Sequence, residues 1–446
     1  MSDISKTINY IKRNGLSKTF SAVSERVREK MNDHYVYTPI SEEERLDQIS
    51  KGLTGKEITF SILVPAYETP EKFLREMTDS VISQTYPSWE LIVADSSATD
   101  SVKKVMETYK EPRIRYIRLD ENKGISGNSN EALKYCTGEY TALLDHDDVL
   151  TVDALFKMAE NIRKYRENGI KLHMLYSDED KTDAETSRFF DANIKPDFNL
   201  DLLLSNNYIC HLLVLLTEDI KALNFRSEYD GAQDHDLILR EVSYLKHEFP
   251  STGDEAYDKY IKHIGRVLYH WRCHSASTAA NPGSKAYAYD AGKRAVSDFL
   301  LRENIKATVS ELPHVGFFRV NYENDIFAER PEIGAVGYRI LDKNGRVKDG
   351  VMDENGDVMF LNLKRNDSGG SLHRAACQML VPYVSVLGML PNHEGSKLLR
   401  ELLNGGEFRD ENGETDYHAL SIRFCDIMKE RGFKFLYDPG TVIEGK

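Results

Sequence analysis

The sequence lacks any hydrophobic run long enough to cross a membrane. No apolar stretch approaches the ~18 residues that a spanning helix needs, and the strongest short run, Leu212–Leu216, is typical of a buried strand. The first residues also lack the apolar segment of a secretory signal. We therefore expect a cytoplasmic chain, either soluble or peripheral at the inner face of the plasma membrane.

Paired cysteines, excess positive charge and the common nucleotide-binding fingerprints are missing as well. The net charge is -14, from 58 Lys and Arg against 72 Asp and Glu, which argues against nucleic acid as a partner. Neither a G-x-G-x-x-G nor a Walker A motif occurs, so a dinucleotide oxidoreductase and a P-loop kinase are poorly supported. The five cysteines have no paired spacing, which favours reduced thiols over a disulfide framework or a zinc site; they are Cys136, Cys210, Cys273, Cys377 and Cys425.

Short apolar runs of strand length alternate with helical patterns in the first half of the chain. This alternation predicts an α/β fold with a mostly parallel sheet and helices on both faces. We expect a helical arm over 1–55, the main domain over 56–315 and a smaller α/β domain over 316–446. The expected strands of the main domain begin with Phe60–Val64, Glu90–Ala94, Ile114–Arg118 and Tyr140–Leu144.

Polar residues follow each of these four strands. Tyr67 follows the first strand, Asp95 the second, the Gly-rich loop 122–130 the third and the acidic turn 145–148 the fourth. Because ligands of such sheets bind at the carboxyl ends of the strands, we expect these residues to share one site. The crowded carboxylates of the turn favour a divalent cation, Mg²⁺ or Mn²⁺, that a diphosphate would complete. The alternative is an acidic turn before a helix capped by Thr151.

Four motifs carry a resemblance to a known family. In chain order they are Ser-Ile-Leu-Val-Pro-Ala-Tyr, Glu-Leu-Ile-Val-Ala-Asp-Ser-Ser-Ala-Thr-Asp, Asn-Lys-Gly-Ile-Ser-Gly-Asn-Ser-Asn and Leu-Asp-His-Asp-Asp-Val-Leu. Together they resemble the family 2 glycosyltransferases, inverting enzymes with the Rossmann-like GT-A fold that binds nucleotide sugars. The second motif reads Asp-Ser-Ser-Ala where the family usually has Asp-Asp-Gly-Ser, which leaves the base of the donor open.

The resemblance implies a role for residues after each strand. Asp95 would bind the nucleobase, and Asp145 and Asp147 would form the D-x-D pair that holds the ribose and a Mn²⁺ or Mg²⁺ on the diphosphate. The other residues expected on the nucleotide and donor side are Ala66, Tyr67, Glu68, Asn122, Gly124 and Asn128.

A strand expected at Met174–Ser177 ends in Asp178, Glu179, Asp180 and Lys181. This stretch resembles a subgroup that includes many rhamnosyl- and surface-polysaccharide transferases. The resemblance suggests that Asp178, Glu179, Asp180 and, further on, His211 face the acceptor. The alternative is a solvated run of charges.

Two later segments supply the remaining chemistry. Inverting transfer needs a base to take the acceptor's hydroxyl proton, and the family places that base at the position of Asp234 in Gly-Ala-Gln-Asp-His-Asp. Asp236 is an alternative helix cap, and both aspartates could instead serve only the helix dipole. In Val-Leu-Tyr-His-Trp-Arg-Cys-His, Arg272 is a candidate diphosphate contact and His274 a candidate third metal ligand, although a structural histidine is an equal alternative.

The two ends of the chain leave alternatives open. Seven Lys and Arg stand against three Asp and Glu in the first thirty residues, so the arm could contact anionic lipid, or pack on the body or on a second copy in a homodimer. The chain beyond residue 316 resembles the later half of a second family 2 module without an acidic turn. It is either a non-catalytic half-domain or an unrelated α/β appendage.

The resemblance predicts a metal-dependent hexosyl- or rhamnosyltransferase. It would move a sugar from a UDP- or dTDP-sugar donor to a glycan or lipid-linked glycan acceptor during bacterial cell-wall and surface-polysaccharide synthesis. The alternative is a carbohydrate-binding scaffold of the same fold without turnover. Asp145, Asp147 and Asp234 favour the enzyme, since a lapsed enzyme has no reason to keep all three.

Overall fold

The computed structural model describes residues 10–12, 14–16, 19–20, 22–27, 34–54, 58–249, 255–274, 286–370, 372–405, 408–409 and 413–444. Two compact units emerge from the packing. The core unit consists of His34–Phe198 and Asn207–Phe299, and the terminal unit consists of Met1–Asp33, Asn199–Asn206 and Leu300–Lys446. Each unit is described by itself, and the expected division into arm, main domain and C-terminal domain stays a prediction.

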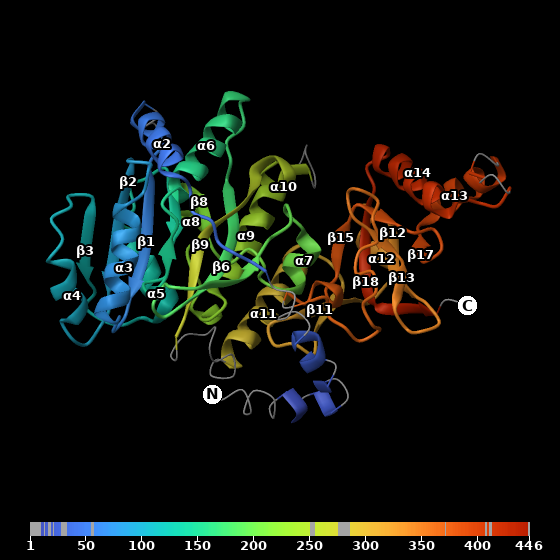
Figure 1. The fold of residues 1–446 in the computed structure, drawn as a ribbon, viewed down its shortest axis with the longest axis horizontal. Coiled ribbons are helices and arrows are strands. Elements are labelled where there is room, and N and C mark those ends of the chain that lie inside the picture. Colours follow the sequence, from blue (N-terminus) through green and yellow to red (C-terminus); the bar gives the residue numbers. More distant parts are fainter. Residues whose placement is uncertain are drawn as a thin grey trace. The chain divides into compact units, whose positions relative to one another are not determined.

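A nine-stranded sheet forms the centre of the core unit, in the order β3-β2-β1-β4-β8-β6-β9-β5, with β7 paired to β6 (Figure 1). All pairs from β3 to β4 are parallel, as is β6 with β9, whereas β8, β5 and β7 pair antiparallel with their neighbours. The α/β class expected from the sequence is confirmed. The strands are β1 (Phe60–Ala66), β2 (Trp89–Asp95), β3 (Ile114–Arg118), β4 (Tyr140–Leu143), β5 (Val149–Leu150), β6 (Met174–Asp183), β7 (Phe189–Asn193), β8 (Leu213–Leu216) and β9 (Ile261–Cys273).

The central strands are buried along almost their whole length. Every residue of β1 except Pro65 is buried, and every residue of β2 except Glu90. Continuous burial of this kind requires cover on both faces of the sheet, which the helices provide. The helices of the core unit are α2 (Glu42–Thr54), α3 (Glu71–Ile82), α4 (Ser101–Met106), α5 (Gly124–Leu133), α6 (Ala154–Glu167), α8 (Thr217–Leu223), α9 (Gln233–Glu248), α10 (Glu255–Tyr260) and α11 (Ala286–Arg302), the last of which continues past the unit's limit; a 3₁₀ turn spans Ser227–Tyr229.

Two local expectations are wrong. The sequence Thr69-Pro70 ahead of a helical pattern predicts an N-cap at Thr69. In the structure α3 begins at Glu71 with Pro70 at the N-cap position, and the Thr69 hydroxyl is buried without a hydrogen-bond partner among the described residues. The strand expected at Met174–Ser177 does not end there either. It continues as β6 to Asp183, so its acidic run is part of a buried strand and not a solvated surface.

The terminal unit contains a smaller sheet in the order β13-β12-β18-β15, with β17 paired to β12. The sequence predicts a strand, a turn at Lys343, Asn344 and Gly345, and a second strand within Gly334–Met352. The structure confirms this, since β12 leads through a turn with Gly345 at φ +72° into β13. The strands are β10 (Ala307–Glu311), β11 (Phe318–Tyr322), β12 (Ile333–Leu341), β13 (Val347–Asp349), β14 (Val351–Met352), β15 (Met379–Val381), β16 (Tyr383–Val384), β17 (Met389–Pro391) and β18 (Lys434–Glu444); the helices are α7 (Leu200–Ser205), α12 (Ile326–Glu329), α13 (His393–Gly405) and α14 (Tyr417–Glu430), with a 3₁₀ turn at Arg374–Ala376.

The described part of the N-terminal arm packs within this unit. The Glu25 carboxylate accepts hydrogen bonds from the backbone N–H groups of Ser368, Gly369 and Gly370 at 2.9–3.1 Å. No helix in the described part of the chain is both long and apolar enough to span a membrane. Contact with anionic lipid and homodimer formation stay predictions, and most of the arm's basic residues, including Lys6, Arg13, Lys18, Arg28 and Lys30, lie outside the described residues.

Candidate functional site

Glu68 ties the loop after β1 to the loop after β2. Its Oε1 accepts from the backbone N–H groups of Ala98 and Thr99 at 2.7 and 3.1 Å, and its Oε2 accepts from Thr99 Oγ1 at 3.0 Å. These bonds, that of the Thr99 side chain first, lower the pKa of Glu68. Ala66 lies beside it at the end of β1, and Tyr67 is 51 % exposed. The three residues expected to line the nucleotide pocket therefore adjoin, with Tyr67 presenting its ring to solvent.

Asp95 is fully buried at the end of β2. Its Oδ1 accepts from Ser97 N at 2.8 Å, and its Oδ2 accepts from Tyr116 Oη at 2.8 Å and Arg118 Nη1 at 2.9 Å. The carboxylate thus fixes the ends of β2 and β3. A nucleobase bound at Asp95 would share this carboxylate with the three groups that already donate to it.

The expected loop 122–130 is helical from Gly124 onward, so the prediction of a loop up to Asn130 is wrong. Asn128 Nδ2 donates to Ser96 Oγ at 3.0 Å and to Asn122 Oδ1 at 2.9 Å. Gly124 has φ +76°, and a Cβ there would lie 2.4 Å from Asp230 Oδ2. Asn122 and Asn128 therefore anchor the start of α5, and glycine permits the close approach of Asp230.

The acidic turn after β4 divides its carboxylates between two roles. Asp148 is 1 % exposed, and its oxygens accept from Arg272 N at 2.7 Å and Tyr269 Oη at 2.5 Å. Burial, followed by repulsion from Asp147 and Asp145, raises the pKa of Asp148 well above its usual value. The Asp145 side chain, in contrast, is 52 % exposed. Asp148 therefore holds the turn against β9, and Asp145 and Asp147 remain available to a ligand.

The two candidates on the segment that ends β9 both contact Asp147. His274 Nε2 lies 2.8 Å from Asp147 Oδ2. The Arg272 guanidinium is fully buried, donates to the Asp147 carbonyl oxygen and forms an ion pair with Glu76 at 2.6 Å. Its Nη2 has no acceptor among the described residues. Arg272 positions the acidic turn, and its expected contact with a diphosphate stays a prediction.

The acidic residues of β6 are not equivalent. Asp178 is buried and contacts His263 Nε2 at 2.8 Å, and Asp180 is buried and contacts His270 Nδ1 at 2.5 Å. Both carboxylates are thus used inside the core unit, and the structure does not present them to an acceptor at the surface. Only Glu179 extends toward the acidic turn, through His211.

Glu179 and His211 form a charged pair beside the acidic turn. His211 Nδ1 lies 3.2 Å from Glu179 Oε2, and the fully buried Lys195 ammonium lies 3.4 Å from the same oxygen. Burial lowers the pKa of His211, but its contacts to Cys210 and Glu179 outweigh this and the net shift is upward. The imidazole stacks on Tyr269 at 4.5 Å with its Nε2 3.8 Å from Asp145 Oδ2. A cationic His211 therefore faces the most exposed carboxylate of the turn.

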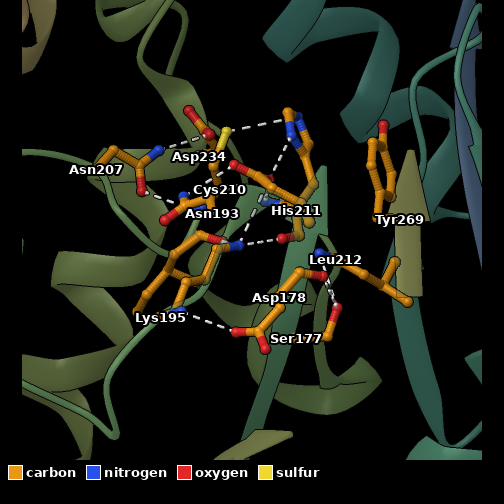
Figure 2. Close-up of polar contacts among 12 residues, drawn as sticks. Ser177, Asp178, Asn193, Lys195, Asn207, Cys210, His211, Leu212, Asp234 and Tyr269 are labelled. Atoms are coloured by element: carbon orange, nitrogen blue, oxygen red, sulfur yellow. Dashed lines mark hydrogen bonds and ion pairs between the residues drawn. The ribbon is translucent and has the colours of Figure 1, made fainter. Parts of the chain in front are cut away.

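Asp234 lies on the other side of the segment that carries His211. Its Oδ2 accepts from Asn207 Nδ2 at 2.7 Å, and Asn207 Oδ1 accepts from Cys210 N at 3.3 Å (Figure 2). Cys210 Sγ in turn lies 3.5 Å from His211 Nε2, and the same nitrogen lies 3.8 Å from Asp145 Oδ2. The structure therefore links Asp234 to the acidic turn through the segment Asn207–His211.

Asp236 has a different role from its neighbour. It does not cap α9, because the N-cap residue is Ala232 and no side-chain cap bond is present there. Its carboxylate instead forms ion pairs with Arg226 and, at 2.9 Å, with Arg240. Asp236 thus supports the helix that presents Asp234.

Comparisons with known proteins identify part of the chain. Residues 61–217 match the model of the family described as Glycosyl transferase family 2. Residues 61–217 form a family 2 glycosyltransferase domain. The chain is 34 % identical over 269 residues to the O-antigen biosynthesis protein RfbC of Myxococcus xanthus, covering 59 % of this chain and 19 % of RfbC. It is 38 % identical over 96 residues to the Escherichia coli UDP-Glc:alpha-D-GlcNAc-diphosphoundecaprenol beta-1,3-glucosyltransferase WfgD, covering 21 % of this chain and 37 % of WfgD.

The chain spans well under half the length of these relatives. Among solved structures, Staphylococcus aureus TarS 1-349 in complex with UDP-GlcNAc gives a TM-score of 0.41 at 18 % identity, over 55 % of this chain and 67 % of TarS. The large sheet with helices packed against it is the α/β arrangement expected from the sequence.

The donor atoms of the acidic turn fit a divalent cation. Asp145 and Asp147 supply carboxylate oxygens, which suit Mg²⁺ and Mn²⁺, and His274 adds an imidazole to Asp147. Ligand atoms of Asp145, Asp148 and His211 also lie within 4.8 Å of one another. Asp145 thus groups with Asp148 and His211, whereas of the expected set Asp145, Asp147 and His274 the structure pairs Asp147 with His274.

Two residues of this site were not among the expected ones. Asn207 holds Asp234, and Tyr269 joins Asp148 to the stacked His211. Tyr269 and His270 are neighbours in β9. Because successive side chains of a strand point to opposite faces, the sequence could have placed Tyr269 on the face opposite His270. No local pattern distinguishes Asn207, because its role depends on α9 reaching it from later in the chain.

We expect the ion pair between Glu179 and Lys195 to make the free energy of unfolding depend on pH in the acid range. Lys195 and His211 outweigh burial and lower the pKa of Glu179 from 4.5 to about 2. A carboxyl with a lowered folded-state pKa stabilises the fold above its unfolded pKa, and this contribution is lost as the pH falls from about 5 toward 2. The free energies of unfolding of Glu179→Gln and of the original chain, measured by chemical denaturation, should differ most at pH 6–7 and less at pH 3. A difference in free energy that grows on acidification would contradict the assigned ion pair.

Proposed function

We propose that the chain is a metal-dependent inverting glycosyltransferase that transfers a sugar from a UDP- or dTDP-sugar to a glycan or lipid-linked glycan in bacterial surface-polysaccharide synthesis. The observation that supports it is the approach of Asp234 to the acidic turn across the segment Asn207–His211. This places a carboxylate that can act as a base beside carboxylates that can hold a donor. The name of WfgD, which gives UDP-Glc as donor and a diphosphoundecaprenol glycan as acceptor, is in keeping with this substrate class.

The chain's own residues account for the steps around the sugar. Asp145 and Asp147, with His274, would hold the cation, which when bound neutralises the charge that develops on the departing diphosphate. Asp234, held by Asn207, would accept the proton of the acceptor hydroxyl as its oxygen attacks the anomeric carbon from the side opposite the diphosphate. A protonated His211 would add positive charge next to the leaving group.

The donor can be tested by ligand-induced stabilisation. A screen of nucleoside diphosphate sugars with Mn²⁺ should find one class that raises the melting temperature, since a ligand at 100 times its Kd adds about 2.7 kcal/mol. We expect EDTA to abolish the shift, and mixing the same donor with an extract of lipid-linked glycans to release nucleoside diphosphate.

The same screen separates the enzyme from a carbohydrate-binding scaffold. A scaffold would be stabilised by oligosaccharides alone and would release no nucleoside diphosphate with any donor. The control is the same donors without metal, which keeps nucleotide and sugar chemistry constant and removes only the cation.

A further inference from the structure

A second group of potential metal ligands lies buried at the amino end of β6. His173 directly precedes that strand, Asp219 is in the first turn of α8, and Glu241 is in the middle of α9. One ligand atom of each lies within 4.8 Å of the other two, and all three residues are buried. Glu179 lies six residues farther along β6, a rise of about 20 Å in an extended strand, so this group is distinct from the acidic turn.

Glu241 is the member of this group whose carboxylate lacks a hydrogen-bond partner among the described residues. Its side chain is fully buried, and neither carboxylate oxygen has a hydrogen-bond donor among the described residues. Burial, followed by repulsion from Asp219, raises the pKa of Glu241 to about 9. A buried carboxylate without a partner costs several kcal/mol. Because Asp219 also carries a carboxylate, either a cation or a shared proton must lie between them.

The geometry favours a cation. His173 Nδ1 lies 2.7 Å from Asp219 Oδ2 and 4.0 Å from Glu241 Oε1. Ligand atoms of a tetrahedral Zn²⁺ site with bonds of 2.0–2.1 Å lie roughly 3.3 Å apart, between these two values, so small side-chain rotations would complete it. Neither Glu241 oxygen has a hydrogen-bond donor among the described residues, so Glu241 adds a third ligand atom to those of His173 and Asp219.

The surroundings are those of an enclosed structural site. Phe249 and Tyr260 pack edge-on against the His173 ring at 5.5 Å. Such an apolar shell limits water and fixes the orientation of the ligand. We propose that His173, Asp219 and Glu241 bind one structural divalent cation, Zn²⁺ in the first place, which ties α8 and α9 to the start of β6.

The test compares the original chain with Glu241→Gln. Glutamine has nearly the same shape and can donate a hydrogen bond to Asp219, so it replaces a shared proton but not a charged metal ligand. We expect about one equivalent of Zn²⁺, measured by plasma mass spectrometry on protein expressed with zinc, and a loss of affinity above 100-fold in the variant, beyond the effect of outer-shell changes. A strong chelator should lower the melting temperature of the original chain but not that of Glu241→Gln.

Asp147→Ala provides the control, since it alters the acidic turn and should keep this zinc. The proposal is overturned if Glu241→Gln is as stable as the original chain, with both insensitive to the chelator and free of zinc; the cluster would then share a proton. If Glu241→Gln does not fold, Asp219→Asn takes its place. The proposal is also overturned if the original chain does not bind Zn²⁺ in calorimetry against a competing chelator. None of these outcomes bears on the proposed glycosyl transfer.

Discussion

Replacing Asp234 by Asn should lower the turnover of glycosyl transfer by about 100-fold or more, the usual contribution of a positioned general base. Asparagine keeps the shape of the side chain but cannot accept a proton from the acceptor hydroxyl. It can still accept the bond from Asn207 Nδ2 that spans 2.7 Å in the structure. Calorimetry with the donor and Mn²⁺ should therefore give nearly unchanged affinity, so that the loss appears in kcat.

A matched control is the same substitution at another helix start. Asp416 caps α14 by accepting from Ala419 N at 3.0 Å, and asparagine caps helices as well as aspartate does. Asp416→Asn should leave both turnover and donor affinity unchanged. Turnover close to that of the original chain in Asp234→Asn would remove Asp234 as the base, and a parallel fall in donor affinity would assign it to donor binding.

The parallel half of the sheet could be predicted because its signals are local. Buried apolar runs between helical patterns placed β1 to β4 within two residues of their observed limits, and the residues after them do line one edge. The antiparallel half could not be predicted in the same way. The carboxylates of β6 are buried because His263, His270 and Lys195 neutralise them from later segments, so charge alone wrongly ended the strand at Ser177.

The candidate site shows the same division. Asp145, Asp147 and Asp234 could be named from motifs, and the structure connects Asp234 to Asp145 through the segment Asn207–His211. Their individual tasks could not be read from spacing. Asp148 differs from Asp147 only because Tyr269 and the backbone of Arg272 meet it inside the core unit. Similarly, only one carboxylate of the run 178–180 reaches the site, through the pairing of His211 with Glu179.

Replacing Asp147 by Ala should weaken Mn²⁺-dependent donor binding by about 100-fold or more, since even outer-shell partners of a metal contribute 10- to 100-fold. The substitution removes the carboxylate whose Oδ2 lies 2.8 Å from His274 Nε2. His274 then remains as the only member of that ligand pair. Donor affinity measured by calorimetry with Mn²⁺ should fall to the level seen with EDTA. Affinity without metal should hardly change, because Asp147 would act through the cation.

Asp148→Asn is the control that decides between the two ligand sets at the turn. Asp148 accepts bonds from Arg272 N and Tyr269 Oη and is buried, so its replacement should lower the melting temperature while Mn²⁺ still strengthens donor binding. The opposite pattern, with metal dependence lost in Asp148→Asn and kept in Asp147→Ala, would place the cation among Asp145, Asp148 and His211, whose ligand atoms also lie within 4.8 Å. His211 would then have to be neutral to bind it, although its contacts to Cys210 and Glu179 raise its pKa. This cost is the physical reason to expect the metal at Asp147.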